Sequence, residues 1–553
     1  MNGADLIANI LKAEGIELVP AFPHSDLIDA VAKLGMRPLI VRQERHALHI
    51  ADGYARTTGG RRICCTTVQY GPGSENAVGA LAQCYADNVP VLHMPGGYAL
   101  GDQGAAPNFN AARNTQLVSK WSEMVLRAER IPEMMQNAFA RLRNGRPGPV
   151  LLEVPIDIFS GAVDAALLES YRPQRRSAPA GAREDVRQVV DMLLGAKSPL
   201  IVAGQGILYA GAWDELRQLA ELTQTPVMST LNGKSAFPEN HPLSLGCAGA
   251  SRPDSVVRFL DKADLILGLG TSFSRSDYIT PFPTKGRTFA QLTNWEGDLA
   301  KDYPLDFGLV GDAKPTIAAI VARATEVMGE SGRRPESAVA DEIAALKAAY
   351  LKQWRPLLES DTVPINPYRV VNDLMASVDR SKTVVTHDAG SPRDQMTAFF
   401  EALTPFGYMG WGKTTQLGMG LGLMQGAKLA RPDWNCINVC GDAAIGMVGM
   451  DIETAVRNRI GTTTIVLKNA VMGGYREYHP SAAEEYAIHE LGGDYADMAK
   501  SLGAHGERVE APAEIKPAIA RALERNAEGS PALLEVITAE EPRMAKKLPS
   551  GID

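Results

Sequence analysis

Two polar residues in the last third of the chain each follow an apolar run and could together hold a cation. Asp442 follows residues 436–440, which we predict to be a buried strand, and Asn469 ends the next such run, "TTTIVLKN". The residues between them leave room for one crossover helix, predicted at about 448–459. Ligands bind beyond the carboxyl ends of parallel strands, so we expect the carboxylate and the amide oxygen side by side. An all-oxygen pair suits Mg²⁺, although such a pair, taken alone, is more often a structural cap than a metal ligand.

The turn after the first of these strands also favours an anion. Gly441 and the small side chains of Ala443 and Ala444 leave backbone N–H groups accessible at the start of a helix. Phosphate groups bind at such helix N-termini. The sequence therefore predicts a phosphate site beside the candidate cation site.

A glutamate in the first third of the chain could supply acid–base chemistry. Glu44 stands where the predicted strand "RPLIVRQ" meets a helix with apolar and small residues. It could cap that helix, face solvent, or transfer a proton in a dry site. We interpret His46 and His49, which follow in the same helix, as residues that pack it against its neighbours.

The elements that must position these residues alternate between apolar strands and amphipathic helices along the whole chain. This alternation is typical of parallel sheets covered by helices, so we predict an α/β fold with three doubly wound parallel-sheet domains. Two polar stretches, residues 170–185 and 328–342, are predicted linkers that leave domains at 1–169, 186–327 and 343–553. The strands "PVLLEV" and "PALLEV", near the ends of the first and third domains, suggest that these two domains are duplicates.

Composition argues against several classes of partner. The net charge is −8 and no basic run occurs, so we expect no nucleic-acid partner. No apolar stretch reaches the roughly 18 residues of a membrane span. The N-terminal segment carries acids and lacks the order of a signal peptide, and the six cysteines show no C-x-x-C spacing. We therefore expect reduced thiols and a cytoplasmic protein that binds small molecules.

The segment "GDAAIGM…LKNAV" resembles the GDG…NN signature of thiamin diphosphate (ThDP) enzymes, with Ala443 replacing the third glycine and Lys468 the first asparagine. The resemblance implies that Asp442, Asn469 and the backbone oxygen of Val471 bind the Mg²⁺ that anchors the diphosphate of the cofactor. It also implies cofactor contacts by other residues of the same two loops, namely Gly441, Ala443, Ala444 and Met472.

The segment "VRQERHALHIADGYARTTG" resembles the pattern "vrhEqaAa-mAdGYAR" of the acetolactate synthase and pyruvate oxidase branch of this family. The resemblance implies that Glu44 bonds to the aminopyrimidine of ThDP and relays the proton that leaves C2 of the thiazolium. The segment "QLGMGLGLMQGAKLA" (416–430) resembles "tMGyGLpaAiGAklA", which gives Leu417 the role of bending the cofactor. Gly390 and Ser391 align with a loop that touches the diphosphate. Such matches follow in order along nearly the whole chain.

The departures from the family pattern concern the substrate. The family's "yPGG" is "FPHS" here, which puts His24 and Ser25 on a loop expected to face C2. Gln69 takes the position of a histidine in benzoylformate decarboxylases. Asn110 stands where acetolactate synthases carry the glutamine of Phe-Gln-Glu, and Tyr478 replaces a tryptophan that shapes the acceptor pocket. We treat these five residues as candidate substrate contacts, with His24 either catalytic or structural.

The central domain departs from its flavin-binding relatives. They read "RFDDR" and "DID", where this chain has "SFSRS" (272–276) and "LTNWE" (292–296). The acids that would hold ribose or adenine are gone, so FAD is not expected.

The favoured function is decarboxylation of a 2-oxo acid with C–C bond formation to a carbonyl acceptor, as in acetolactate synthase. Gln69 and Asn110 are poor acids, so we expect the carbon that has lost CO₂ to add to a second carbonyl group before it is protonated. The alternatives are a simple 2-oxo acid decarboxylase and an enzyme like 2-hydroxyacyl-CoA lyase or oxalyl-CoA decarboxylase. The resemblance further implies a homodimer or homotetramer with active sites between subunits.

Two other classes fit less well. A nicotinamide oxidoreductase would need G-x-G-x-x-G after a first strand and an acid about 20 residues on, and neither occurs. A binding or regulatory homologue without catalysis would have no reason to keep Glu44, Asp442 and Asn469 together.

Overall fold

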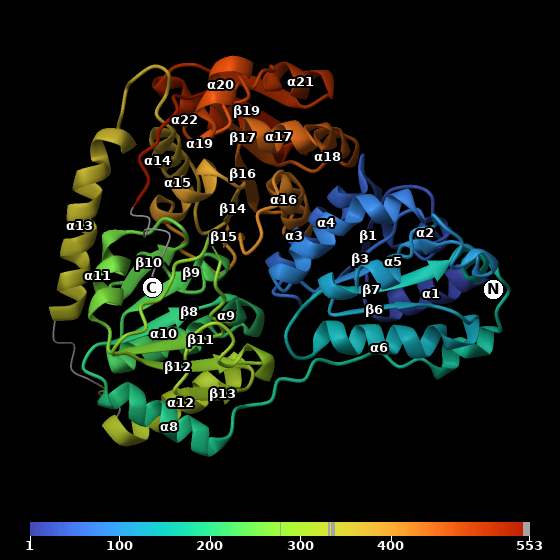
Figure 1. Cartoon of the computed structure of the whole chain (residues 1–553), viewed down its shortest axis with the longest axis horizontal. Coiled ribbons are helices and arrows are strands. Elements are labelled where there is room, and N and C mark those ends of the chain that lie inside the picture. Colours follow the sequence, from blue (N-terminus) through green and yellow to red (C-terminus); the bar gives the residue numbers. More distant parts are fainter. Residues whose placement is uncertain (277, 330–331, 333–337, 546–553) are drawn as a thin grey trace.

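The structure is a computed structural model that describes residues 1–276, 278–329, 332 and 338–545. Three domains of parallel strands covered by helices follow one another along the chain (Figure 1). The predicted α/β class with three such domains is confirmed. Residues 546–553 of the predicted third domain, and 330–331 and 333–337 of the predicted second linker, lie outside the described residues.

The first domain places one layer of helices on each face of its sheet. Its strands are β1 (Leu18–Ala21), β2 (Arg37–Ile40), β3 (Cys64–Thr66), β4 (Val91–His93), β5 (Gly96–Gly97), β6 (Trp121–Met124) and β7 (Val150–Pro155). Its helices are α1 (Gly3–Ala13), α2 (Leu27–Lys33), α3 (Glu44–Thr57), α4 (Pro72–Ala86), α5 (Ala111–Asn114), α6 (Ile131–Arg143) and α7 (Ile156–Ser160). One apolar core joins the sheet to α1, α2 and α6, and another joins it to α3 and α4.

The central domain holds six parallel strands in the order β10-β9-β8-β11-β12-β13. These are β8 (Pro199–Ala203), β9 (Val227–Thr230), β10 (Ser244–Ala248), β11 (Leu265–Leu269), β12 (Thr288–Thr293) and β13 (Phe307–Val310). Helices α8 (Arg183–Gly195), α9 (Gln205–Ala210), α10 (Trp213–Thr223) and α12 (Ala313–Met328) cover one face. Helix α11 (Asp254–Lys262) covers the other. Strands such as "LILGL" are buried throughout, because helices exclude water from both faces.

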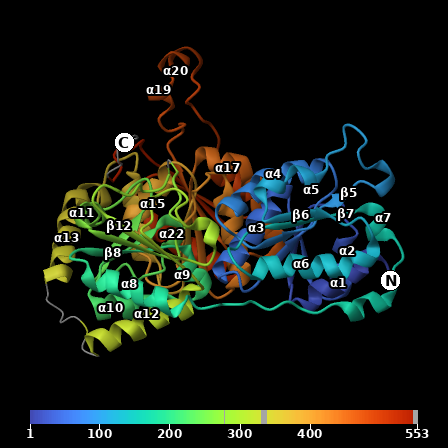
Figure 2. The ribbon, with the colours of Figure 1, turned by 60° about the horizontal axis from the view of Figure 1, so that its bottom comes forward.

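The third domain orders its strands β15-β14-β16-β17-β19-β18. These are β14 (Thr383–His387), β15 (Tyr408–Met409), β16 (Asn435–Gly441), β17 (Thr463–Lys468), β18 (His505–Val509) and β19 (Ala532–Ile537). Its helices are α14 (Pro367–Ser377), α15 (Ser391–Phe399), α16 (Met419–Ala430), α17 (Asp442–Val448), α18 (Ile452–Asn458), α19 (Tyr475–Tyr478), α20 (Pro480–Tyr486), α21 (Tyr495–Ser501) and α22 (Ile515–Ala527). Figure 2 shows α19 and α20 standing out from the body of the protein.

The predicted linkers are shorter than the polar stretches suggested. Tyr171 is buried in the core of the first domain, although it falls in the first predicted linker. Helix α13 (Ala338–Leu358) begins inside the second and crosses the expected boundary at 343. It packs through Ile343 on the central domain and through Tyr350 and Trp354 on the third, and this apolar face explains why the helix continues through a polar sequence.

The first and third domains have the same strand order. A bridge between Ala21 and Thr67 joins β1 to β3 and completes the order β2-β1-β3-β4-β7-β6 in the first domain. Numbered along each domain, both sheets then read 2-1-3-4-6-5, apart from the short β5. The two "LLEV" strands are β7 and β19, and each carries a buried glutamate that accepts a backbone N–H from the start of a helix: Glu153 from Ala112, and Glu535 from Ala496. These shared features support the expected duplication.

Candidate active site

Asp442 and Asn469 lie side by side at the carboxyl ends of β16 and β17, which pair in parallel. Asp442 is buried, and its Oδ2 accepts the backbone N–H groups of Asn469 at 3.1 Å and of Ala470 at 3.2 Å. Its Oδ1 is also buried and has no hydrogen-bond partner among the described residues. Burial raises the pKa of Asp442 above its usual range, against the backbone N–H groups and the charge of Lys468, which lower it. A cation at Oδ1 would satisfy this oxygen.

The loop after β17 turns sharply at this corner. Ala470 has φ +58°, a left-handed conformation that is uncommon for a residue other than glycine. The turn lets the N–H of Val471 donate to Asn469 Oδ1 at 3.2 Å. Val471 forms a bridge with Glu490, and the N–H of Met472 donates to the carbonyl of His489 at 2.7 Å. The strained backbone thus keeps Asn469 and Val471 at the same corner as the aspartate.

The loop between β14 and α15 closes the corner from the other side. Gly390, at φ +88°, precedes α15 with no neighbouring atom within 4 Å of the place where a Cβ would be. The Ser391 hydroxyl lies 3.5 Å from the corresponding place on Gly473, and Pro392 lies beside Gly441. The ends of β14, β16 and β17 therefore form one edge, lined by small residues and by the first N–H groups of α15 and α17.

This edge fits a magnesium ion and a diphosphate. It offers an unpartnered carboxylate oxygen and an amide side chain, and the Val471 carbonyl belongs to the same loop. Among the described residues no group of three or more His, Cys, Asp or Glu side chains could hold a metal. A site built on one carboxylate, one amide and backbone would not form such a group, and Mg²⁺ takes its remaining ligands from phosphate and water.

The helix predicted at about 448–459 differs from the one that forms. Two helices connect β16 to β17: α17 begins directly at Asp442, and α18 covers only 452–458. A short 3₁₀ turn from Gly449 to Asp451 separates them, because the glycine ends α17. The early start of α17 brings its N-terminus to the cation corner, as an anion site requires.

Glu44 is the first residue of α3, and its side chain is buried. The N-cap position belongs to Gln43, so Glu44 neither caps the helix nor faces solvent. Its Oε2 accepts the side-chain amide of Asn76 at 3.1 Å, and its Oε1 lies 3.6 Å from the place of a Cβ on Gly73. Gly73 also lies against the Cβ of Gln69, so Gln69 and Glu44 share one edge of the first domain.

A second predicted group of residues gathers at the same edge. Thr67 Oγ1 and Ser25 Oγ are 2.9 Å apart, which holds the "FPHS" loop against the segment that leads to Gln69. His24 is exposed on this loop. Asn110 caps α5, where its Oδ1 accepts the N–H of Arg113 at 2.7 Å, and its amide is 3.5 Å from Gln103. Asn110 therefore has a structural bond of its own.

Tyr478 lies apart from the other candidates. It belongs to α19, where its side chain is 75% exposed and rests against Gly474. Its role at an acceptor pocket stays a prediction.

The two functional edges meet along a seam between the first and third domains. The side chains of Gln43 and Arg45 donate to the carbonyl of Met447 in α17 at 3.3 and 3.0 Å. The backbone N–H of Arg42 donates to Asp451 at 2.8 Å. Leu417 precedes Gly418, which lies against Ala444 and Val448 of α17. Glu44 thus begins α3, and Leu417 lies just before α16. These two helices pack on one another in the same chain.

Two kinds of residue at this site were not predicted from the sequence. Asn76 lies in α4, and its contact with Glu44 depends on how α3 crosses α4. His46 and His49 were interpreted only as packing residues; both are buried in α3, but they also bond to Gln425 and Gln416. A useful signal was that polar glutamines occupy an otherwise apolar and glycine-rich segment.

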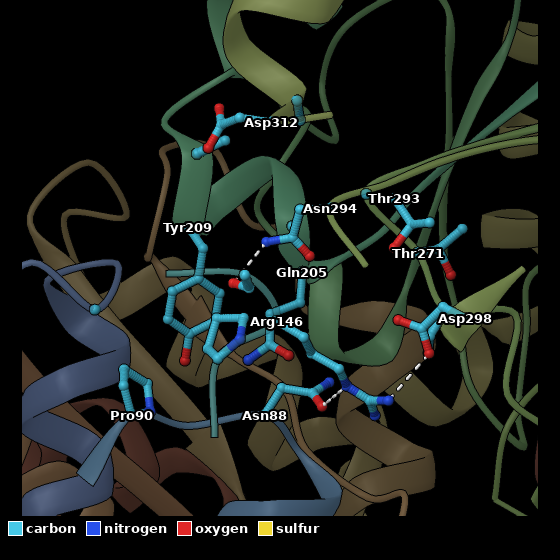
Figure 3. Close-up of a pocket in the computed structure, with 18 of the residues that line it drawn as sticks. Asn88, Pro90, Arg146, Gln205, Tyr209, Thr271, Thr293, Asn294, Asp298 and Asp312 are labelled. Atoms are coloured by element: carbon cyan, nitrogen blue, oxygen red, sulfur yellow. Dashed lines mark hydrogen bonds and ion pairs between the residues drawn. The ribbon is translucent and has the colours of Figure 1, made fainter. Parts of the chain in front are cut away.

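A cavity of about 750 Å³ lies between the first and central domains, and none of the predicted site residues lines it (Figure 3). Asn88 and Arg146 of the first domain face Gln205, Thr271 and Asp298 of the central domain across it. Both acids in its lining are paired: Asp298 with Arg146 at 3.1 Å, and Asp312 with Arg176 at 2.9 Å. The cavity is therefore separate from the candidate active site.

Comparison with known proteins matches three successive segments of the chain to three family models. Residues 1–124 match the N-terminal TPP binding domain of thiamine pyrophosphate enzymes, 186–320 their central domain, and 388–536 their C-terminal TPP binding domain. A probable acetolactate synthase large subunit from Methanococcus aeolicus is 28% identical over 95% of this chain and 90% of its own. Acetolactate synthase isozyme 3 large subunit of Escherichia coli K12 is 26% identical over 95% and 92%. A glyoxylate carboligase from Escherichia coli O157:H7 is 28% identical over 97% and 93%.

Proposed function

The chain belongs to the thiamine pyrophosphate enzymes, and we propose that it decarboxylates a 2-oxo acid and joins the product to a second carbonyl compound. The observation that carries this proposal is the similarity, over nearly the full length of each chain, to proteins named acetolactate synthase and glyoxylate carboligase. When bound, ThDP supplies the carbon nucleophile and the electron sink that decarboxylation requires.

In this proposal Asp442, Asn469 and the Val471 carbonyl hold Mg²⁺, and the N–H groups at the start of α17 receive the diphosphate. The buried Oδ1 of Asp442 supports the assignment, because no protein group satisfies it among the described residues. Gly390, Ser391, Gly441, Ala443, Ala444 and Met472 line the same edge and complete the diphosphate site.

Glu44 acts as the proton relay in this proposal. Its burial keeps water from the carboxyl group, and Asn76 fixes one of its oxygens at 3.1 Å, so that Oε1 is left to face the cofactor. A positioned carboxyl group in a dry site transfers protons efficiently. Leu417 supplies the apolar surface on which the cofactor bends.

The side chains beside Glu44 favour carboligation. Gln69 and Asn76 are amides and release no proton, so they leave the carbon that has lost CO₂ free to add to a carbonyl. The runner-up is a simple decarboxylase, which His24 favours because an imidazolium on the exposed "FPHS" loop could protonate that carbon. We propose Ser25, Gln69, Asn110 and Tyr478 as further substrate contacts.

A product assay tests this proposal. Purified protein with ThDP and Mg²⁺ should convert pyruvate or glyoxylate to a C–C coupled product, and added aldehyde should be consumed. The Glu44→Gln variant should lose nearly all turnover while it still binds ThDP. Free aldehyde as the main product, suppressed in His24→Ala, would assign the protein to the decarboxylases, and wild-type turnover in Glu44→Gln would overturn the mechanism.

Three further points belong to the same proposal. We propose that the central cavity holds no FAD, and this is supported by Asp298 and Asp312, the acids in its lining, which are paired with arginines. A homodimer or homotetramer is supported by Met447 and Met450, which are 51% and 48% exposed beside the helix of Glu44.

A cytoplasmic location is supported by the six cysteines, which are free thiols and buried. No helix in the described part of the chain is both long and apolar enough to cross a membrane.

A further inference from the structure

A buried aspartate stands between the end of β14 and the loop that carries Gly390 and Ser391. The side chain of this residue, Asp388, is 1% exposed. Its backbone N–H donates to the carbonyl of Val439 in the neighbouring strand β16 at 2.7 Å, which continues the pairing of the two strands past the end of β14. The sheet itself therefore fixes the position of Asp388.

The carboxylate of Asp388 accepts three backbone N–H groups from two segments of the chain. Oδ1 accepts the N–H of Ala389 at 2.8 Å and that of Gly418 at 2.9 Å. Oδ2 accepts the N–H of Gly420 at 3.0 Å. Ala389 belongs to the loop before α15, and Gly418 directly follows Leu417. One side chain therefore joins these two segments.

Helix α16 begins without a cap of its own. Its N-cap residue is Gly418, at φ +89°, which has no side chain to accept an N–H group. A Cβ there would lie 2.9 Å from a methyl group of Val448, so a capping side chain at this position would displace α17. Asp388 accepts the N–H groups of the N-cap residue and of the second helical residue, and so supplies the missing cap from another segment.

The first turn of α16 also lies close to β16. A Cβ on Gly420 would stand 2.1 Å from Oδ1 of Asn438, which lies four residues before Asp442 in the same strand segment. The start of α16 is thus held by Asp388 on one side and by β16 on the other. The segment of Leu417 has little freedom to move while both contacts are present.

An acid at this place needs an explanation, because the loop beside it is proposed to receive a diphosphate. A carboxylate repels an anion, and asparagine or serine caps a helix about as well as aspartate does. Asparagine has only one acceptor oxygen, however, and would turn an N–H₂ group toward one of the three donors. In the observed geometry the three N–H groups use both oxygens of Asp388, so only a carboxylate satisfies them all.

The carboxyl group is mostly ionised near neutral pH. Burial raises the pKa of Asp388 to about 6, against the three N–H groups and the charge of Arg45, which lower it. The ionised form accepts N–H groups at both oxygens, whereas the protonated form would direct an O–H at one of the donors.

We propose that Asp388 is a positioning residue that sets Leu417 relative to the loop at 389–391, and so fixes where the cofactor bends relative to where its diphosphate binds. The inference rests on the proposed function, because it assumes that both segments contact ThDP. Both segments belong to the third domain of one chain, so they meet the same cofactor even where Glu44 comes from another subunit. Asp388 acts through them, since N–H groups occupy both of its oxygens.

The alternative is that Asp388 only stabilises α16. Loss of a helix cap lowers the melting temperature in either case, so stability alone does not separate the two roles. The rate at which bound ThDP exchanges its C2 proton, read by NMR at saturating ThDP and Mg²⁺, does separate them. It reports how closely the bend at Leu417 brings the amino group of the cofactor to C2.

The variants are Asp388→Asn, which keeps the shape and loses one acceptor, Leu417→Ala, and the double variant of the two. Asp388→Ser is a second variant at the same position, with the same expected result if the asparagine variant does not fold. The control is Asn366→Ala in the same domain. Asn366 caps α14, where its Oδ1 accepts the N–H of Tyr368 at 3.0 Å.

We expect Asp388→Asn and Leu417→Ala each to slow C2 exchange about tenfold to hundredfold. The double variant should be no slower than the slower of the two, because effects do not add when one residue acts through the other. Asn366→Ala should lower the melting temperature and leave C2 exchange at the wild-type rate.

A second readout needs no cofactor. In cofactor-free protein, amide hydrogen exchange of residues 416–421 should rise severalfold in Asp388→Asn, because the first turn of α16 loses a partner. Asn366→Ala should leave the exchange of these residues unchanged.

Wild-type C2 exchange in Asp388→Asn or in Leu417→Ala would overturn the inference, as would wild-type amide exchange of residues 416–421 in Asp388→Asn. A double variant that slows C2 exchange by the product of the two single effects would also overturn it, because the two residues would then act independently. A failure of the proposed function is seen separately: Glu44→Gln would then leave C2 exchange at the wild-type rate. If Glu44→Gln abolishes exchange and Asp388→Asn does not slow it, only the positioning role is wrong.

Discussion

Asp442 places one carboxylate oxygen against two backbone N–H groups, and its other oxygen is buried with no hydrogen-bond partner in the part of the chain that the structure describes. Such an arrangement costs free energy in a protein without a bound cation, and the raised pKa of this residue expresses that cost. The same arrangement lowers the cost of binding a cation, because the carboxylate does not have to leave a protein partner. This arrangement is what the proposed cation site requires.

Replacement of Asp442 by alanine should therefore abolish Mg²⁺-dependent binding of ThDP. We expect the affinity measured by calorimetry to fall by more than the 10- to 100-fold typical of residues that only support a metal ligand. Asp497→Ala, which removes an exposed acid paired with Lys500, should leave the affinity unchanged. Equal affinity in Asp442→Ala and wild type would refute the metal assignment.

Glu153 shows how one buried carboxyl group can make stability depend on pH. It is 1% exposed, and burial raises its pKa to about 7, against the N–H groups of Ala112 and Ala111. Since the folded state keeps this proton at pH values where the unfolded chain has lost it, stability is fully present below about pH 4.5 and falls as pH rises toward 7. The loss is up to about 3 kcal/mol.

Glu153→Gln should remove this pH dependence and keep an oxygen for the N–H of Ala112. The melting temperature of the variant should exceed that of wild type by an amount that grows from pH 5 to pH 8. Glu535→Gln is the comparison variant. It removes the ion-pair partner of Lys468 and should lower the melting temperature throughout that pH range. Parallel pH curves for wild type and Glu153→Gln would rule out the titration of Glu153.

The sequence predicted those residues whose neighbours follow from strand order. Asp442 and Asn469 end consecutive parallel strands, so their proximity needs only the topology. Asn76 and Glu44 meet because two helices cross at a particular angle, and no local pattern sets that angle. Gln416 and Gln425 are more than 360 residues from their histidine partners, which is why His46 and His49 could be interpreted only as packing residues.

At the scale of elements, the crossing of α3 and α16 depends on backbone contact. Gly53→Ala should place a methyl group 2.1 Å from the Leu423 carbonyl, within a helix that cannot move without shifting Glu44. We expect a cost of about 1–3 kcal/mol or more. This corresponds to a fall in melting temperature of about 2–4 °C for each kcal/mol in a domain of this size.

Gly195→Ala is the matched control for this prediction. Gly195 is the last residue of α8, and no atom lies within 4 Å of the place of its Cβ. Alanine there should be neutral or stabilising by about 0.5–1 kcal/mol. A melting temperature of Gly53→Ala that equals that of Gly195→Ala would show that the crossing can open without cost.

At the scale of the whole molecule, the seam leaves apolar surface beside the functional edges. Met447 and Met450 are exposed there, and α19 and α20 extend from the body (Figure 2). If a second subunit covers this surface, Glu44 of one chain would serve the Asp442 corner of the other. Mixing inactive Glu44→Gln and Asp442→Ala proteins under subunit exchange should then restore part of the activity. No recovery, with exchange confirmed by mass, would assign both residues to one chain.

The central domain should remain free of flavin. The acids that line its cavity are bound by Arg146 and Arg176, so ribose hydroxyls would find no free carboxylate (Figure 3). The absorbance spectrum of the purified protein should therefore lack flavin bands, also after incubation with FAD and gel filtration. A stoichiometric flavin band would contradict this.

The common strand order of the first and third domains has a consequence for the origin of the molecule. Counted along each domain, α3 and α16 are the same helix, since each follows the second strand and precedes the third. Their contact is therefore of the kind found between identical subunits related by a twofold axis. An ancestor made of one such domain would have paired with its own copy through this helix. Fusion of two copies would then have freed each to diverge, so that one domain now carries Asp442 directly after its third strand and the other carries Gln69 three residues beyond its own.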